Sequence, residues 1–113
     1  DVTTGMKTLM ARADKVSEGK TMLGKIYEQG MGVDADYTKA LYWFQQAANE
    51  GDAEAQYKLG GMYEGALGVK QDRKTALTWY LIAQAGGNDD AKNALTILIH
   101  TAGQMAPARR RRF

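Results

Sequence analysis

The sequence has no cysteine, a single histidine (His100) and a single proline (Pro107) among its 113 residues. Without cysteine, the chain has no disulfide framework, no thiolate metal site and no cysteine nucleophile. One histidine cannot supply a multi-histidine zinc site, and no apolar run approaches the roughly 18–20 residues that span a bilayer. Because 44% of the residues are apolar, the composition is that of one small folded domain rather than of a disordered segment.

Positive charge is concentrated at one end of the chain. The formal net charge is +2, but a run of four arginines outweighs a mildly acidic remainder. These residues are Arg109, Arg110, Arg111 and Arg112. Adjacent like charges are normally solvated, so we expect residues 104–113 to form a flexible arginine-rich tail that ends at Phe113. Such a tail suits an acidic protein surface or anionic lipid, and nucleic acid is less favoured because no basic face accompanies the tail.

Glycine is abundant, with 13 residues, and an internal repeat explains where the glycines stand. A shift of 36 residues aligns residues 23–59 with residues 59–95 without a gap and gives 14 identities in 37 positions. The matched pairs include Trp43 with Trp79. Self-similarity at one fixed period is the signature of a solenoid.

Each period predicts two helices, here called helix A and helix B. In helix A, apolar residues such as Ala55, Leu59 and Met62 recur on one helical face, and helix B repeats the pattern from Ala40 onward. The expected N-caps are Asp36, Asp52, Asp72 and Asn88. The sequence therefore predicts an all-α fold of stacked helix pairs.

Six positions are expected to hold the helix pairs together. They are Gly24, Tyr27, Trp43, Gly60, Tyr63 and Trp79. The two glycines lie in mid-helix, where glycine costs about 1 kcal/mol relative to alanine. We expect a close approach between helices to compensate for that cost.

The segment Leu23 to Ala55 carries the pattern Leu-Gly-x-x-Tyr-x-x-Gly-x-Gly-Val-x-x-Asp-x-x-Lys-Ala-x-x-Trp-Phe-x-x-Ala-Ala-x-x-Gly-x-x-x-Ala. This pattern resembles the Sel-1-like repeat, a relative of the tetratricopeptide repeat. Leu59 to Ala91 resembles it too, with departures such as Ala66 in place of the first turn glycine. The resemblance implies a right-handed α/α superhelix that binds proteins.

The two ends depart from the full repeat. A solenoid over residues 1–103 would contain a degenerate capping helix, two full units and an orphan helix A. The expected ranges are 4–15 for the capping helix, 16–51 and 52–87 for the units, and 88–102 for the orphan helix. Ser17 and Glu18 are expected to start the first helix A, while Gly103 and Pro107 end the last one. Without a following helix B, Leu98 and Ile99 are expected to form an apolar partner-binding edge together with the tail.

A strip along the A helices is the expected concave binding surface, because A helices line the concave side in related solenoids. The strip comprises Glu18, Thr21, Lys25, Glu28, Glu54, Tyr57, Glu64, Asn93 and Ile97. It is acidic on balance, which suits a basic or extended peptide, with Tyr57 as an anchor.

Patterns typical of enzymes are weak. Ser17 and Lys20 match the Ser-x-x-Lys of penicillin-recognising enzymes, but the companion Ser-Asp-Asn and Lys-Thr-Gly sequences are absent. Asp34 and Asp36 lack the further oxygen ligands of a calcium loop, so capping is the preferred role of Asp36. We expect no catalytic residue, no cofactor and no metal.

The sequence therefore favours a non-enzymatic adaptor, or an accessory or scaffold subunit of a larger bacterial assembly, with a membrane-associated assembly as one setting. Contact of the tail with anionic lipid or nucleic acid is the alternative, and a β-lactam-binding enzyme is a less favoured one. We expect export to the periplasm, with Asp1 following a cleaved signal.

Overall fold

The structure, a computed structural model, describes the backbone of residues 2–110 and the side chains of residues 16–101. Within these residues it contains helices and no strand. The helices are α1 (Val2–Gln29), α2 (Tyr37–Asn49), α3 (Ala53–Gly65), α4 (Arg73–Ala85) and α5 (Asp89–Arg110). The expected all-α fold of helix pairs is confirmed.

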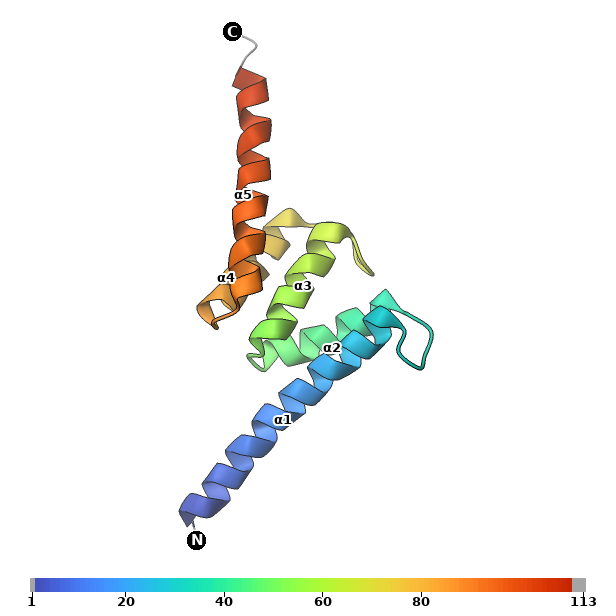
Figure 1. The fold of residues 1–113 in the computed structure, drawn as a ribbon, viewed down its shortest axis with the longest axis vertical. Coiled ribbons are helices and arrows are strands. Elements are labelled where there is room, and N and C mark those ends of the chain that lie inside the picture. Colours follow the sequence, from blue (N-terminus) through green and yellow to red (C-terminus); the bar gives the residue numbers. More distant parts are fainter. Residues whose placement is uncertain (1, 111–113) are drawn as a thin grey trace.

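The helices stack in chain order to form a short solenoid (Figure 1). The principal contacts join α1 to α2, α2 to α3, α3 to α4 and α4 to α5. The molecule is elongated, 72 × 35 × 17 Å, because the two terminal helices extend from the central stack in opposite directions (Figure 1). No helix in the described part of the chain has the length and hydropathy needed to cross a membrane.

Carboxylate and amide side chains begin the helices as the repeat predicts. Asp36 accepts a hydrogen bond from the backbone N–H of Lys39 at 3.1 Å, and Asp72 accepts one from Thr75 at the same distance. The expected caps of α3 and α5 are confirmed too: Asp52 accepts from Ala55 N at 3.2 Å and Asn88 accepts from Ala91 N at 2.8 Å. Each cap satisfies one of the backbone donors that a helix start leaves unpaired.

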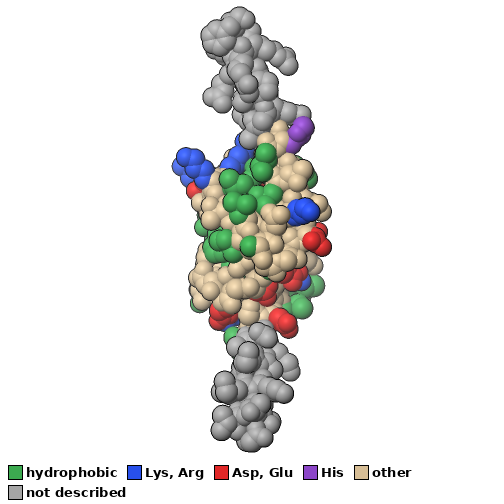
Figure 2. Space-filling model, turned by 90° about the vertical axis from the view of Figure 1, so that its left-hand side faces the viewer, with side chains coloured by type: hydrophobic (Ala, Val, Ile, Leu, Met, Phe, Trp, Pro, Cys, Tyr) green, Lys and Arg blue, Asp and Glu red, His purple; other side chains and the backbone are tan. Residues whose placement is uncertain are grey.

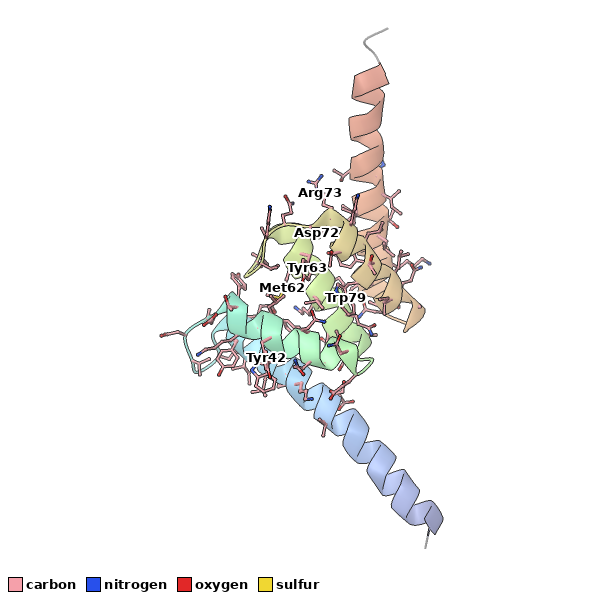
Figure 3. The ribbon with its side chains drawn as sticks, turned by 180° about the vertical axis from the view of Figure 1, so that it is seen from behind. Tyr42, Met62, Tyr63, Asp72, Arg73 and Trp79 are labelled. Atoms are coloured by element: carbon pink, nitrogen blue, oxygen red, sulfur yellow. The ribbon has the colours of Figure 1, made fainter. Side chains whose placement is uncertain are left out.

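The Asp72 cap at the start of α4 is fully exposed (Figure 3). Hydrogen bonds from the backbone N–H and then the hydroxyl of Thr75 lower the pKa of the Asp72 carboxyl, because they favour its charged form.

Backbone conformation explains the turn residues. Gly51 and Gly87 end the two B-to-A turns with φ of 96° and 93°, a region that favours glycine. Ala66 closes α3 in the left-handed conformation, with φ of 57° and ψ of 41°, although it has a Cβ atom. The turn therefore keeps its shape where the repeat lacks its usual glycine, at a strain cost of about 1–2 kcal/mol.

The two mid-helix glycines accommodate aromatic rings. A Cβ atom on Gly24 would lie 2.6 Å from the Phe44 ring, and one on Gly60 would lie 2.7 Å from the Tyr80 ring. Phe44 and Tyr80 are buried and stand 36 residues apart, so both units use the same contact. The close approach expected at Gly24 and Gly60 is present, and its partner is a ring from helix B of the same unit.

Two apolar clusters form the core. The first consists of Ala40, Phe44, Ala47, Ala48, Ala55, Leu59 and Met62. The second consists of Ala76, Tyr80, Ala83, Ala91, Leu95 and Leu98. Tyr63 packs against both clusters, whereas Tyr27 and Trp79 pack against the first. Figure 3 labels Tyr63 and Trp79. Trp43 is half-buried and meets Tyr42 edge-on, with ring centroids 5.1 Å apart.

The N-terminal boundary differs from the prediction. A separate capping helix over residues 4–15 was expected, but α1 runs without a break from Val2 to Gln29. Ser17 and Glu18 therefore lie inside a helix and do not start one. The physical reason is that Lys15 and Val16 occupy the places of Gly51 and Asp52, and neither supplies a glycine turn or a cap.

The C-terminal boundary differs as well. The orphan helix was expected to end at residue 102, but α5 continues through Gly103 and Pro107 to Arg110. The part of the expected flexible tail over residues 104–110 is therefore helical, and Arg111, Arg112 and Phe113 lie outside the described residues. Glycine only lowers helix propensity, and a proline near a helix end removes one backbone bond that fraying residues hold weakly.

Candidate functional site

In the structure, the strip predicted along the A helices runs between α1 and α3, and polar pairs connect its two sides. Lys25 forms an ion pair with Glu54. Lys58 pairs with Glu28, Nζ to Oε1, at 3.2 Å. These pairs connect parallel neighbouring A helices, so the strip is continuous over the first two units.

A hydrogen-bond network closes the N-terminal part of this surface. The Thr21 hydroxyl lies 2.8 Å from Asp52 Oδ2 and 3.1 Å from the carbonyl oxygen of Ser17. Thr21 is only 3% exposed. The sequence placed Thr21 on the partner-binding strip, but in the structure Thr21 positions the α3 cap against α1 and is not an open contact.

Hollows follow the boundary between α1 and α3. A cavity of about 670 Å³ is lined by residues around Glu18, Glu50 and Asp52. A second, of about 360 Å³, shares Glu18 and Asp52 and reaches Lys25 and Glu54. We call the two together the α1–α3 groove.

A smaller hollow of about 160 Å³ continues the line toward the α3–α4 turn. It is lined by Glu28, Tyr57, Lys58, Gly61, Met62 and Leu67. Tyr57 is half-buried, and its ring centroid lies 6.0 Å from that of Tyr80. The expected anchor residue therefore lies beside an open space, because its neighbour Gly61 has no side chain.

The groove is acidic. Glu18, Glu50, Asp52 and Glu54 contribute carboxylates, whereas Lys20 and Lys25 are each engaged by one of them. On the face shown in Figure 2, acidic side chains gather in the lower half of the described surface and apolar ones in the upper half. A cationic segment would find its charge complement in the lower half.

The predicted strip weakens toward the end of α3 and on α5. Glu64 is occupied inside the chain, since the Tyr80 hydroxyl donates to its Oε1 at 2.6 Å. Burial, and then the hydrogen bond to Glu64, raise the pKa of the Tyr80 phenol. Asn93 and Ile97 are exposed on α5, and Ile97 is 63% exposed. These two lie on a helix that turns away from α1 and α3 (Figure 1).

The predicted C-terminal edge is corrected in part. Leu98 is 8% exposed and belongs to the second core cluster, so it is a core residue. The physical reason is that Leu98 occupies the place of Met62 on the face that the preceding helix B covers. Ile99 is 61% exposed, as expected. The side chains of Arg109 to Phe113 lie outside the described residues.

Ser17 and Lys20 do not form a catalytic pair. Ser17 is 8% exposed, and its hydroxyl points to Asp52 Oδ2 at 3.5 Å. The Lys20 ammonium lies 2.6 Å from Glu50 Oε1. A serine nucleophile needs a base within hydrogen-bond reach, and here each residue is directed to a different carboxylate. Among residues 16–101, no group of three or more histidine or carboxylate side chains is placed to hold a metal ion.

Several groove residues were not predicted from the sequence. They are Lys20, Glu50, Asp52 as a groove residue, and Lys58. Their bonds connect residues about 30 apart and not 36, for example Lys20 with Glu50 in the α2–α3 turn, so the repeat period does not predict these contacts.

Comparison with known proteins agrees with this architecture. A model of the Sel1 repeat matches residues 17–52 and 53–88, each unit one residue later than expected. The chain is similar to a Sel1 repeat protein from Oxalobacter formigenes, with 41% identity and a TM-score of 0.69 over 71% of this chain and 60% of that chain. It is similar to cysteine rich protein B of Helicobacter pylori, with 29% identity and a TM-score of 0.66 over 70% and 59%.

It is also similar to c5321, a protective antigen of uropathogenic Escherichia coli strains with an SLR fold, at 33% identity and a TM-score of 0.69. That match covers 83% of this chain and 20% of that one. The chain thus spans less than two thirds of each of these solved chains. No curated protein matches the sequence.

Proteins built from Sel1 repeats generally mediate protein–protein interactions. The two matched units cover more than half of the chain, and the fold, the caps and the glycine contacts recur in both. The chain belongs to the Sel1 repeat family.

Proposed function

We propose that the chain is a non-enzymatic interaction module, acting as an adaptor or accessory subunit, that binds an extended basic segment of another protein in the α1–α3 groove. The observation that carries the proposal is the pair of adjoining cavities that share Glu18 and Asp52. Together they form an acidic channel on the surface that two neighbouring repeats build.

Electrostatics favour a cationic ligand in this place. The ion pair of Lys25 with Glu54 is partly exposed, with side-chain exposures of 26% and 46%. Exposed pairs contribute about 0–1 kcal/mol each, so a lysine or arginine of a ligand exchanges with Lys25 at small cost. Glu18, which lines both cavities, is exposed and lies where such a ligand enters.

The smaller hollow supports an apolar contact farther along. An extended peptide advances about 3.3 Å per residue, so one ligand segment of several residues reaches from the acidic cavities to Tyr57. Tyrosine beside a hollow is a typical anchor in peptide recognition. The expected ligand therefore carries lysine or arginine at one end of its contact and an apolar side chain at the other.

Selection of peptides from a random display library on the immobilised full chain tests this proposal. We expect the selected peptides to be enriched in lysine and arginine. The variant Glu54→Lys should weaken a selected peptide about tenfold, equivalent to about 1.4 kcal/mol. Asp34→Lys makes the same charge change on an exposed turn residue outside the groove, and it should leave binding unchanged.

Two results would overturn the proposal. One is a selection that yields peptides without excess positive charge. The other is an equal loss of affinity in Glu54→Lys and Asp34→Lys, which would mean that only the net charge of the chain matters.

A further inference from the structure

Each of the two cavities of the α1–α3 groove has a half-exposed apolar side chain in its wall. Val16 lines the first cavity, of about 670 Å³, and Met22 lines the second, of about 360 Å³. Both side chains are 51% exposed, although they stand beside carboxylates. Apolar surface that is open to water in such a place favours a ligand that covers it.

The second unit carries different residues at these two positions. The residues 36 positions after Val16 and Met22 are Asp52 and Lys58, which are polar and bond to side chains of α1. The second unit therefore folds without an apolar residue at either position. The apolar walls of the two cavities are a departure from the repeat and are not a requirement of its helix packing.

The charge of the groove sets the number of cations that it can hold. Asp52 is already occupied, because its Oδ1 accepts from the backbone N–H of Ala55 and its Oδ2 accepts from the Thr21 hydroxyl. Four carboxylates and two lysines leave this part of the groove with a net charge of −2; they are Glu18, Glu50, Asp52, Glu54, Lys20 and Lys25. Two cationic side chains of a ligand would neutralise it, one in each cavity.

Lysine and arginine combine the two chemistries that each cavity offers. Their aliphatic stems lie along apolar surface while the charged head remains in polar surroundings. A stem on Val16 places its head in the cavity that Glu18 and Glu50 line. A stem on Met22 places its head in the cavity that Glu18 and Glu54 line. A short amine would reach the carboxylates but would leave both apolar walls uncovered.

The spacing of the cavities sets the spacing of the two cations. The α1 residues that line the first cavity centre on Ser17, and those that line the second centre on Thr21 and Met22. At about 1.5 Å of rise per residue, the cavities lie about 7 Å apart along α1. In an extended segment, side chains two residues apart point to the same side and are also about 7 Å apart, whereas adjacent ones point to opposite sides.

We propose that the α1–α3 groove selects segments with two lysine or arginine residues at positions i and i+2, whose stems pack on Val16 and Met22. The proposal rests on the proposed function of the groove and names the ligand pattern within it. Because Glu18 lines both cavities, both cations gain from the same carboxylate.

The peptide selection on the full chain tests the spacing. Among selected peptides with two basic residues, pairs at i and i+2 should be enriched over adjacent pairs by about threefold, the factor that one exposed ion pair contributes. Basic peptides without a preferred spacing would overturn this proposal and leave the proposed function intact. Peptides without excess positive charge would overturn both.

Synthetic peptides test the contact with the stems. One selected peptide is prepared with its two lysines and again with 2,4-diaminobutyric acid, which keeps the charge but has two fewer methylene groups. The shorter form should bind about tenfold more weakly, because it leaves the apolar walls uncovered. Fluorescence anisotropy of the labelled peptides with the full chain measures both affinities.

Two methionines provide matched variants of the chain. Met22→Gln keeps the length of the side chain and should weaken the lysine peptide about fivefold, whereas binding of the shorter peptide should change little. Met31 is similarly exposed, at 47%, but lies in the turn after α1, and Met31→Gln should have no effect. Glu18→Gln removes charge alone and should weaken both peptides by the same factor.

The variants separate a contact with the stem from an attraction of charge. Equal affinities of the two peptides, or equal effects of Met22→Gln and Met31→Gln, would overturn the proposal, because the groove would then recognise charge alone. An equal loss of both peptides in Met22→Gln would overturn it too, because Met22 would then maintain the groove without contacting the stem.

Discussion

The adjacent glycines of α3 provide a matched pair for testing how the two helices of a unit are held together. A Cβ atom on Gly60 would lie 2.7 Å from two atoms of the Tyr80 ring and 3.3 Å from the carbonyl oxygen of Ala76. A Cβ atom on Gly61 would meet only the Tyr80 hydroxyl oxygen, at the ordinary contact distance of 3.7 Å. The same substitution, glycine to alanine, therefore has opposite consequences one residue apart.

The magnitudes follow from two effects. Alanine is about 1 kcal/mol more favourable than glycine in a helix interior, and both variants receive that gain. Gly60→Ala also forces a buried ring and the helix backbone apart, and overpacking of this kind costs about 1–3 kcal/mol. With three contacts inside normal distances, we expect the upper part of that range and a net loss of about 2 kcal/mol. Gly61→Ala should gain about 1 kcal/mol.

Urea and thermal unfolding followed by circular dichroism measure both changes. In a domain of this size, 1 kcal/mol shifts the melting temperature by about 4–8 °C. We expect Gly60→Ala to melt about 10 °C below the unmodified chain and Gly61→Ala about 5 °C above it. If the two variants shift the melting temperature in the same direction, the ring contact does not account for the glycine in the repeat.

Three further predictions concern stability. Asp72→Ala should lower the melting temperature at neutral pH but not in acid. The Asp72 carboxylate has a lowered pKa, so it stabilises the fold above pH 3.8 and loses that effect as the pH falls through the pKa of the folded state. Thermal melts of both chains from neutral to acid pH measure the difference. Tyr80→Phe should reduce the loss of stability at alkaline pH. The raised pKa of the Tyr80 phenol gives stability that is complete below pH 10 and is lost as the pH rises above it. If urea unfolding on both sides of pH 10 shows the same decrease in unfolding free energy for both chains, the prediction is wrong. Leu98→Asp should cost about 3 kcal/mol in urea unfolding, because it buries a charge in the second core cluster, whereas Ile99→Asp should stay within about 0.5 kcal/mol; equal losses would contradict the burial difference.

The repeat pattern predicted the contacts that form within each unit. The four helix caps and the packing role of Gly24 and Gly60 follow from local rules that apply twice in the chain, and the structure confirms them. Two copies of one pattern are informative because a residue that recurs, such as Gly24 at Gly60, is constrained by the same kind of ring contact in both places.

The ends were less predictable because no second copy exists to define them. A separate capping helix was expected over residues 4–15, but the turn chemistry that would separate it from helix A is missing at Lys15 and Val16. For Leu98 a signal was available: the 36-residue shift places it at the position of Met62, and both are buried. The absence of a following helix B suggested an open edge, whereas the shift would have indicated a core residue.

The polar contacts of the groove could not be predicted from the sequence for a different reason. They depend on the stagger between α1 and α3, which the three-dimensional stack determines and the repeat period does not contain. Thr21 and Asp52 bond at 2.8 Å, whereas their counterparts 36 residues on, Tyr57 and Asn88, are a phenol and an amide in place of a hydroxyl and a carboxylate. A contact that occurs in only one place does not appear as a repeated pattern in the sequence.

The most direct test of the binding account is an NMR titration of the full chain with a basic peptide selected on it. The account predicts that chemical-shift changes concentrate in residues 18–28 of α1 and 52–61 of α3, and that they weaken as salt is added because exposed charges are screened. Changes confined to α4 and α5, or binding that salt does not affect, would contradict the assignment of the α1–α3 groove as an acidic peptide-binding site.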